Sequence, residues 1–465
     1  MTSNSDIEKC SKMASLLLKR LVTTRGIYAS TDSGWQGSFH AFFGRDSAIT
    51  ASLIFSAEAI RYRRKRLGRR AYQGLLYLRH WQGAYNNPAT GEEVGKISHE
   101  VRTGTSRNGQ TLGRLRAFRK LWYLDPRDHL LKNWDSADST PLWVIAVARW
   151  HEVSEVAYSP EVLKSLHAGL DWCLRNVAEY GGLAGFTGAD LRPERKTTGL
   201  HNQSWKDNYG AYQYPDGSLA KHPIKDVFVN GACWAAFKYG AAIFRERDPI
   251  FAAVLEQSAK DLKDHFNHPK HGFLMMDSQT MLHYYAEALD GDGKPLRSIS
   301  ADVAMCLRAY CGNECIIDSM YVADVARRVT MEDMLNPEAG IRTYSSSTVV
   351  PKLYQGGYHR SSHTYWPFVS GLIVEGLDHF GYKREAEMVA NAMLMGVSHF
   401  NSCIEMFLEV EPHVFRPWHN VDNKQQSATN QAWTAAAMYY AASYLLLSEQ
   451  RPGHTTKREA VSARL

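Results

Sequence analysis

The order of apolar and polar positions along the 465-residue chain predicts helices almost throughout. Apolar residues recur every three or four positions, which is the spacing of one helical face. This pattern predicts helices over residues 7–22, 46–63, 139–153, 159–177, 226–246, 249–266, 298–310, 365–380, 383–399 and 427–447. Alternating strand patterns are scarce, and the connections are rich in Gly, Trp, Tyr, His and Asp. The sequence therefore predicts an all-α chain with its polar and aromatic residues in loops.

The organisation of the chain favours one large domain. No Pro/Ser-rich linker and no change in composition divides residues 1–450, so a single helical domain is expected there. Residues 451–465 offer little to bury, and we expect them to form a disordered tail. The repeated order of helix, polar loop and helix is what a closed ring of helical hairpins would give, with loops gathered at one end around a site.

Charge and hydropathy limit the kinds of partner that we expect the chain to bind. The formal net charge is +6, and much of it lies in the Arg/Lys-rich run 61–70. Such a run can contact phosphates, but it is usually the solvated end of a helix and its loop, so we expect no nucleic-acid partner. The N-terminus has neither a basic segment nor an apolar stretch, and nowhere do eighteen apolar residues follow one another. We expect a cytoplasmic protein without a membrane segment, and the sequence leaves the oligomeric state open.

The cysteines and motifs exclude several classes of site. Seven cysteines, an odd number, lie at positions 10, 173, 233, 306, 311, 315 and 403, and we expect reduced thiols in the core. Cys311 and Cys315 have the spacing of half a metal site without a matching second pair, so we expect no metal and no cofactor. Phosphate-binding glycine loops and the G-x-S-x-G elbow are missing from the sequence, which argues against kinases, dehydrogenases and serine hydrolases.

The segment 202–208, Asn-Gln-Ser-Trp-Lys-Asp-Asn, is the most informative part of the sequence. An indole covers the apolar face of a sugar and removes water, which raises a carboxyl pKa, and amide side chains hydrogen-bond hydroxyls. Lys206 acts in the opposite direction and favours an ionised Asp207, so the protonation state stays open. Alone, the segment also fits an ordinary surface loop; other segments change that balance.

Three more segments suit carbohydrate chemistry but also have simpler interpretations. Arg45 and Asp46, flanked by aromatic residues in segment 35–47, suit polyol recognition, and Asp46 or Ser47 equally suits a helix N-cap. In segment 95–102, Glu100 neighbours an imidazole and a guanidinium, and the spacing favours a structural salt bridge. Segment 135–143 is a strong helix start, which capping by Ser or Asp explains adequately.

Two segments near the C-terminus complete the set. The two histidines in 358–367 lack the Glu of a zinc-protease helix, so packing explains them better than metal ligation. The acidic segment 403–411 would place Glu405, Glu409 and Glu411 on one face if it were extended, and any of the three could be a base. Carboxylates far apart in sequence, in an aromatic and hydroxyl-friendly setting, are the equipment for glycoside hydrolysis.

The order of these motifs resembles the amylo-α-1,6-glucosidase module of glycogen debranching enzymes, within the (α/α)6-barrel glycoside hydrolases. The matching segments span residues 35–437: Gly44-Arg45-Asp46-Ser47, Lys96-Ile97-Ser98-His99-Glu100-Val101-Arg102, Asp138-Ser139-Thr140-Pro141, Asn202-Gln203-Ser204-Trp205-Lys206-Asp207, Tyr358-His359, Trp366-Pro367, Ile404-Glu405-Met406-Phe407 and Asn430-Gln431-Ala432-Trp433. Each motif alone is weak, but the ordered set is specific. The resemblance implies an all-α fold, an (α/α)6 barrel of six inner and six outer helices.

The resemblance also implies roles for individual residues. Asp207 would be the general acid, kept protonated by desolvation, and Glu405 the base that activates water with inversion. In an inverting enzyme the two carboxyl groups stand roughly 6.5 to 9.5 Å apart. Substrate binding would fall to Trp35, Arg45, Asp46, Glu100, Asp138, Trp205, Lys206, Tyr358, His359, Trp366, Gln431 and Trp433.

Two departures from the family pattern qualify the substrate. Phe368-Val369-Ser370 stands where many relatives carry His-Asp-Asn, and Asn208-Tyr209 follows Asp207 where Ser is usual. We expect the chain to start at the barrel, without the β-rich domain or the glucanotransferase half of complete debranching enzymes, which favours a smaller α-glucoside over a long branched glucan. From the motif order we expect an inverting α-glucosidase acting on α-1,6 or related linkages. The alternatives are hydrolysis of a small α-glucoside or α-mannoside, such as a glycosylglycerate or a disaccharide, and sugar binding without catalysis.

Overall fold

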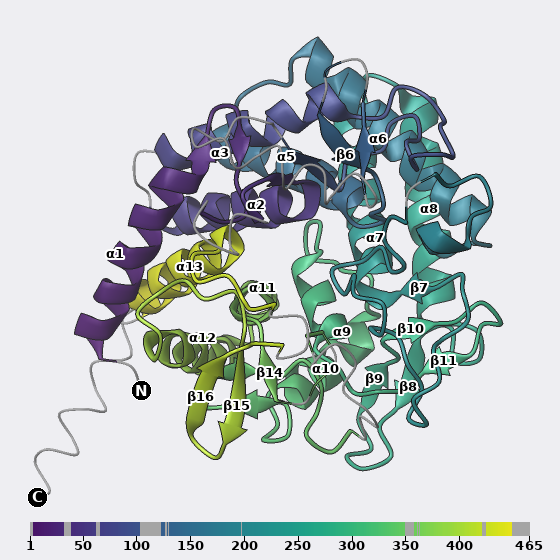
Figure 1. Cartoon of the computed structure of the whole chain (residues 1–465). Helices are drawn as coiled ribbons and strands as arrows, with labels where there is room; N and C mark the ends of the chain where they lie inside the picture. Colours follow the sequence, from purple (N-terminus) through teal and green to yellow (C-terminus); the bar gives the residue numbers. More distant parts are fainter. Residues whose placement is uncertain are drawn as a thin grey trace, which may run out of the picture.

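The computed structural model describes residues 3–31, 39–61, 66–102, 122–125, 128, 130–196, 198–348, 358–359, 361, 363–420 and 425–448. The predicted pocket residue Trp35 and the predicted tail 451–465 lie outside these ranges. Within them, the helices alternate along the chain between an outer and an inner ring (Figure 1).

Six helices form the inner ring: α2 (Gly44–Arg61), α5 (Ser139–Ser154), α7 (Val227–Phe244), α9 (Asp302–Met305, continued by the 3-10 turn η4, Cys306–Arg308), α11 (Pro367–His379) and α13 (Ala432–Ser448). Each packs on the next, and α13 returns to α2, which closes the ring. The outer helices are α1 (Asn4–Leu21), α3 (Arg66–Tyr77), α6 (Pro160–Glu179), α8 (Pro249–Phe266), α10 (Val322–Val329) and α12 (Lys383–Ser398). The chain thus has the predicted (α/α)6 barrel fold.

Burial explains which helices are inner and which are outer. An inner helix is covered on every side, so α7 buries almost all of its residues. An outer helix buries one stripe of side chains. α6 buries Val162, Leu166, Leu170 and Cys173, which are spaced three or four apart, and its opposite face is exposed to solvent. α7 is also the one described helix long and apolar enough to cross a membrane, and 89% of its apolar window is buried inside the barrel.

Each of the ten predicted helical ranges contains a helix, but two outer helices were missed. The Arg/Lys-rich run that we interpreted as the end of a helix and its loop extends into α3, which begins at Arg66. Gly68 and Gly74 weaken its helical signal, and Gly74 is required because a Cβ there would meet the Thr23 carbonyl oxygen at 2.6 Å. α10 has only eight residues, too few to show a clear period.

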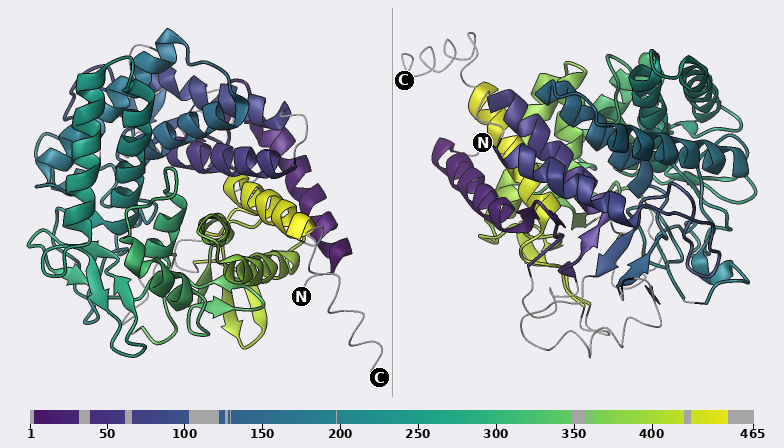
Figure 2. Two further views of the ribbon diagram at one scale, coloured as in Figure 1. Left: turned by 180° about the vertical axis from the view of Figure 1, so that it is seen from behind. Right: turned by 90° about the horizontal axis from the view of Figure 1, so that it is seen from above.

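Short antiparallel strands gather at one end of the barrel (Figure 2, right). The larger sheets run β3-β4-β6-β5 and β14-β15-β16. The strands are β1 (Val22–Thr23), β2 (Gly26–Ile27), β3 (Phe42–Phe43), β4 (Glu100–Arg102), β5 (Tyr123–Leu124), β6 (Leu131–Asn133), β7 (Lys225–Asp226), β8 (Leu274–Met276), β9 (His283–Tyr285), β10 (Ala288–Leu289), β11 (Pro295–Leu296), β12 (Leu335–Asn336), β13 (Gly340–Ile341), β14 (Thr364–Tyr365), β15 (Phe407–Glu411) and β16 (Val414–Pro417). Because β3 and β7 run directly into α2 and α7, this is the end where inner helices begin.

The cysteines fit the reduced-core prediction. All seven are free, and all are buried except Cys311, which is partly exposed. They pack as small apolar side chains inside the barrel.

Candidate active site

Several residues of the site lie at or next to the N-terminal ends of inner helices. Arg45 and Asp46 lie in the first turn of α2, Asp138 directly precedes α5, and Trp366 directly precedes α11. Gly44 allows this arrangement, because a Cβ on it would meet the Ser98 carbonyl oxygen at 2.4 Å. The close approach holds the start of α2 against the strand that carries Glu100. Loops between helices deliver Asp207 and Glu405.

Arg45 lies at the centre of the site and joins three segments. Its Nε donates to Asp138 Oδ2 at 2.6 Å, its Nη2 to the Ser204 carbonyl oxygen at 2.6 Å, and its Nη1 to Asp207 Oδ2 at 3.3 Å. Only 3% of the Arg45 side chain is exposed. Asp138 occupies the N-cap position of α5 but makes no side-chain capping hydrogen bond; of the Ser and Asp that the sequence suggested as caps, Ser136 accepts from the Ser139 N–H through Oγ at 3.1 Å. The Asp138 carboxylate instead fixes the guanidinium that contacts Asp207.

Asp207 is the most open carboxyl group in this set. Its side chain is 28% exposed, whereas Asp46, Glu100 and Glu405 are 6% exposed or less. Burial raises the pKa of Asp207 to about 6, against the attraction of Arg45, which lowers it. Arg45 therefore lowers the pKa of Asp207, the effect that the sequence suggested for Lys206. The Lys206 side chain is instead directed into the protein.

Glu405 is buried and held by two donors. Tyr358 OH donates to Oε1 at 3.0 Å, and the Ala428 backbone N–H donates to Oε2 at 2.8 Å. Both contacts favour the carboxylate, but burial has the larger effect and raises the pKa of Glu405 to about 7; the charge of Asp207 adds to the rise. The two carboxyl groups thus share one electrostatic environment, although their segments are far apart in sequence.

The structure separates the three glutamates that the sequence left open. Glu409 pairs with Arg342 Nη1 at 2.9 Å and accepts from Tyr365 OH at 2.8 Å, which contribute to lowering its pKa despite the burial that raises it. Glu411 is exposed at the end of β15. Among the three, Glu405 is the one whose pKa is raised by the charge of Asp207; its role as the base stays a prediction.

Asp46 and Glu100 are two further buried carboxyl groups that interact with Asp207. Burial raises the pKa of Asp46 to about 8; Arg45 opposes the rise, and Glu405 and Asp207 add to it. Burial also raises the pKa of Glu100 to about 7, although Arg102 lowers it through the ion pair that the spacing predicted. Gln431, another predicted pocket residue, lies 3.5 Å from Asp46 through its amide nitrogen.

Aromatic side chains form one wall of the site. Trp205 meets His359 and Trp366 edge to face at 5.5 and 5.7 Å, and Phe368 stacks on Trp433 at 4.1 Å. Phe368, which the family resemblance aligned with a His, is therefore part of this apolar wall. Tyr358 continues it to Trp418, at 4.6 Å, which we did not predict because no motif marks it.

Two indole N–H groups in this wall are buried without a protein partner. Within the described residues, Trp366 Nε1, Trp433 Nε1 and Gln431 Oε1 have none. A buried polar group without a partner costs about 1–3 kcal/mol, and such groups mark places where water or a ligand completes the bonding.

The residues before and after Asp207, Lys206 and Asn208, both have hydrogen-bond partners in distant segments of the chain. Lys206 is fully buried and donates to Glu287, Asp302 and Tyr344 at 2.8, 2.8 and 3.1 Å, so its ammonium group is directed into the protein rather than presented to the pocket. Burial alone would lower the pKa of Lys206, but the two carboxylates raise it well above its usual value. His359 Nδ1 contacts Asn208 Oδ1 at 2.7 Å. The sequence did not reveal these partners, because they come from distant segments of the chain.

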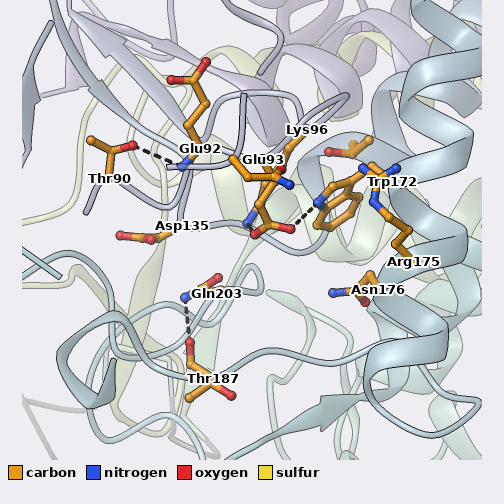
Figure 3. Close-up of polar contacts among 12 residues, drawn as sticks. Thr90, Glu92, Glu93, Lys96, Asp135, Trp172, Arg175, Asn176, Thr187 and Gln203 are labelled. Carbon is orange, nitrogen blue, oxygen red and sulfur yellow. Dashed lines mark hydrogen bonds and ion pairs between the residues drawn. The ribbon is translucent and has the colours of Figure 1, made fainter. Parts of the chain in front are cut away.

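The segment leading to Glu100 is anchored outside the pocket (Figure 3). Lys96 pairs with Glu93 at 3.1 Å, and Trp172 of α6 donates through Nε1 to the same carboxylate at 2.8 Å. Below this anchor, Gln203 donates to the Thr187 carbonyl oxygen at 2.9 Å. These contacts fix the β4 strand and the Asp207 loop on the barrel. In the part of the chain that the structure describes, no group of three His, Cys, Asp or Glu residues is arranged to hold a metal ion.

Comparisons with known proteins agree with this architecture. No family model and no curated protein sequence matches the chain, whereas many solved structures do. GH63 mannosylglycerate hydrolase from Thermus thermophilus, in complex with glucose, superimposes with a TM-score of 0.57 at 15% identity, over 92% of this chain and 98% of that one. A glycosidase with a glutamate-to-alanine substitution, also in complex with glucose, gives 0.55 at 12% identity, over 96% and 99%.

The shared feature is the (α/α)6 toroid, which these neighbours have over nearly their whole length. The resemblance to (α/α)6 glycoside hydrolases is thus confirmed as a statement about fold. The narrower resemblance to the debranching module stays a prediction.

Proposed function

We propose that this chain is a glycoside hydrolase that cleaves an α-glycosidic linkage with inversion. The observation that carries the proposal is the meeting of Asp207 and Glu405 beside Arg45 and an aromatic wall. Two carboxyl groups with raised pKa values, from separate loops, are the equipment of this reaction. The unpaired indole donors of the wall suit sugar hydroxyls.

The proposed mechanism uses the two carboxyl groups in one step. Asp207 donates its proton to the glycosidic oxygen as the bond from that oxygen to the anomeric carbon breaks. Glu405 takes a proton from a water molecule that attacks the same carbon from the opposite face. The products are the released alcohol and a sugar of inverted configuration. This step involves neither a redox change nor a cofactor.

The raised pKa values of both carboxyl groups leave the assignment of acid and base to experiment. Burial raises the pKa of Glu405 to about 7 and that of Asp207 to about 6, and Arg45 opposes the rise at Asp207. The proposed roles require the proton on Asp207 when the substrate is bound. The same geometry would also permit exchanged roles.

Glycosyl fluorides separate the two assignments, because fluoride leaves without a proton. We expect Asp207→Asn to retain most of its activity on an α-glycosyl fluoride and to lose about 10²- to 10⁴-fold on a natural glycoside. Glu405→Gln should lose activity on both. If Glu405→Gln retains fluoride hydrolysis and Asp207→Asn does not, the roles are exchanged.

The substrate class has two candidates. The order of motifs favours an α-1,6-linked glucoside, whereas the mannosylglycerate hydrolase neighbour favours a small glycosylglycerate. A panel of isomaltose, panose, limit dextrin, trehalose, glucosylglycerate and mannosylglycerate tests both. Preference for panose or limit dextrin would support the debranching type, and preference for a glycerate glycoside would support the second.

Sugar binding without turnover is the non-enzymatic alternative. It predicts calorimetric binding to members of the panel, no product, and unchanged affinity in Asp207→Asn. Turnover by the native chain that Asp207→Asn abolishes would exclude it.

A further inference from the structure

Both residues that precede Asp207 hydrogen-bond to one carboxylate, that of Asp302. Trp205 Nε1 donates to Oδ1 at 2.7 Å, and Lys206 Nζ donates to Oδ2 at 2.8 Å. Asp302 is fully buried and is the first residue of the inner helix α9. One side chain on a rigid element therefore binds two consecutive residues of the loop that carries the proposed acid.

The carboxylate of Asp302 is itself fixed. Ser300 Oγ donates to Oδ2 at 2.7 Å. Glu287 accepts from the same ammonium group of Lys206 at 2.8 Å, and Tyr344 OH donates to Glu287 at 2.5 Å. Asp302 and Glu287 thus carry the same charge toward Lys206, and Asp302 in addition accepts the hydrogen bond of the Trp205 indole.

We infer that Asp302 is a positioning residue that sets the direction of the Asp207 carboxyl group through Trp205 and Lys206. This inference rests on the proposed function. The segment 202–209 has no helical or strand hydrogen bonds of its own, so the position of Asp207 depends on such contacts. A displacement of 1 Å at a reacting group can cost roughly 10²-fold in rate.

We also expect removal of the Asp302 charge to act on Asp207, through Lys206. Asp302→Asn preserves shape but removes one negative charge, which leaves Lys206 less neutralised. The extra positive field favours the Asp207 carboxylate and lowers its pKa, so the alkaline limb of kcat, which in the substrate complex reports loss of the Asp207 proton, moves to lower pH. Besides Asp302, the charged and titratable groups that interact with Asp207 or Lys206 are Arg45, Asp46, Glu100, Asp138, Tyr212, Asp226, Glu287, Tyr344, Tyr358, His359 and Glu405.

The test compares Asp302→Asn with the matched variant Glu287→Gln in full kinetic pH profiles. For Asp302→Asn we expect kcat to fall about 10- to 100-fold with KM within about threefold. Both variants should move the alkaline limb to lower pH, but Glu287→Gln should lose less kcat. Adding Trp205→Phe to Asp302→Asn should cost less than Trp205→Phe costs the native chain, because the shared contact is already weakened.

A second readout does not need turnover. The indole N–H resonance of Trp205, assigned by its loss in Trp205→Phe, should move upfield in Asp302→Asn because the acceptor is no longer charged, and it should remain in place in Glu287→Gln. Native kcat and an unmoved alkaline limb in Asp302→Asn would overturn the inference, as would a loss of kcat that thermal unfolding fully explains. If the native chain turns over no substrate, the proposed function fails, and the indole shift still reports on the contact.

Discussion

Two buried glutamates at opposite ends of the barrel show how the same residue type acquires opposite properties. Glu405 lies at the end where the inner helices begin, and its pKa rises to about 7. Glu375 lies near the far end, in the last turns of α11, and its pKa is lowered. Both are almost fully buried, at 2% and 3% exposure, so burial alone does not explain the difference.

The difference lies in the neighbouring charges. Glu375 accepts from Arg149 Nη1 at 2.6 Å, Arg308 Nε at 3.1 Å and Ser56 Oγ at 3.0 Å. Burial raises its pKa, but the two guanidinium groups outweigh that effect. At the other end, Glu405 meets hydroxyl and amide donors and another carboxylate. The far end therefore holds paired charges, and the end with Glu405 holds carboxyl groups whose pKa values allow proton exchange near neutral pH.

The largest effect should come from exchanging each glutamate for glutamine. Glu405→Gln should lower kcat by about 10²- to 10⁴-fold, because the proposed base is gone. Glu375→Gln, the matched control, should keep native kcat per folded molecule because no catalytic step uses it. Steady-state kinetics corrected for the folded fraction makes the comparison; equal losses in both variants would contradict it.

The next effect concerns stability at the far end. Arg149→Met leaves Glu375 with one guanidinium instead of two, and breaking a buried ion pair in this way costs about 3–5 kcal/mol in the free energy of unfolding. Urea denaturation measures the change. Arg175→Met, at a surface pair about half exposed on both partners, should change stability by about 1 kcal/mol or less. A change in Arg149→Met as small as that control would show that the cluster does not stabilise the barrel.

The two glutamates should also give opposite pH dependences of stability. The raised pKa of Glu405 means that folding favours its proton, so the native chain loses stability relative to Glu405→Gln as pH rises from about 4.5 through about 7. The lowered pKa of Glu375 means that the native chain loses stability relative to Glu375→Gln as pH falls below about 4.5. Unfolding free energies from pH 3 to pH 8 give both slopes, and slopes of the same sign would refute the comparison.

The smallest effect should be a displacement of the pH profile. Activity needs one protonated and one ionised carboxyl group, so we expect a bell-shaped profile with its maximum between about pH 6 and pH 7. Tyr358→Phe removes a donor that stabilises the Glu405 carboxylate, so the pKa of Glu405 rises and the limb that it controls moves to higher pH. A limb that stays in place or moves to lower pH would exclude this hydrogen bond as a determinant.

Sequence reasoning worked where the physics is local. The three-to-four spacing of apolar residues is set within each helix, and it located all six inner helices. The ordered motifs brought forward Arg45, Asp46, Asp207 and Glu405, whose charges interact with one another in the structure. Trp35 lies outside the described residues, so its predicted role stays open.

Sequence reasoning failed where the residues that contact each other come from distant segments of the chain. Asp138 looked like a helix cap, yet its carboxylate binds Arg45 from another helix. Lys206 looked like a pocket cation, yet Glu287 and Asp302 hold it below the pocket. No pattern in the sequence joins positions nearly a hundred residues apart, so Asp302 could be found only from the fold.

The most direct test of the proposed chemistry is a proton NMR time course of the anomeric signals released from the preferred α-glycoside of the panel. The β-anomer should appear first, before mutarotation, and should be undetectable on the same time scale with Asp207→Asn and Glu405→Gln. Release of the α-anomer first, or unchanged release by either variant, would contradict inversion by this pair of carboxyl groups.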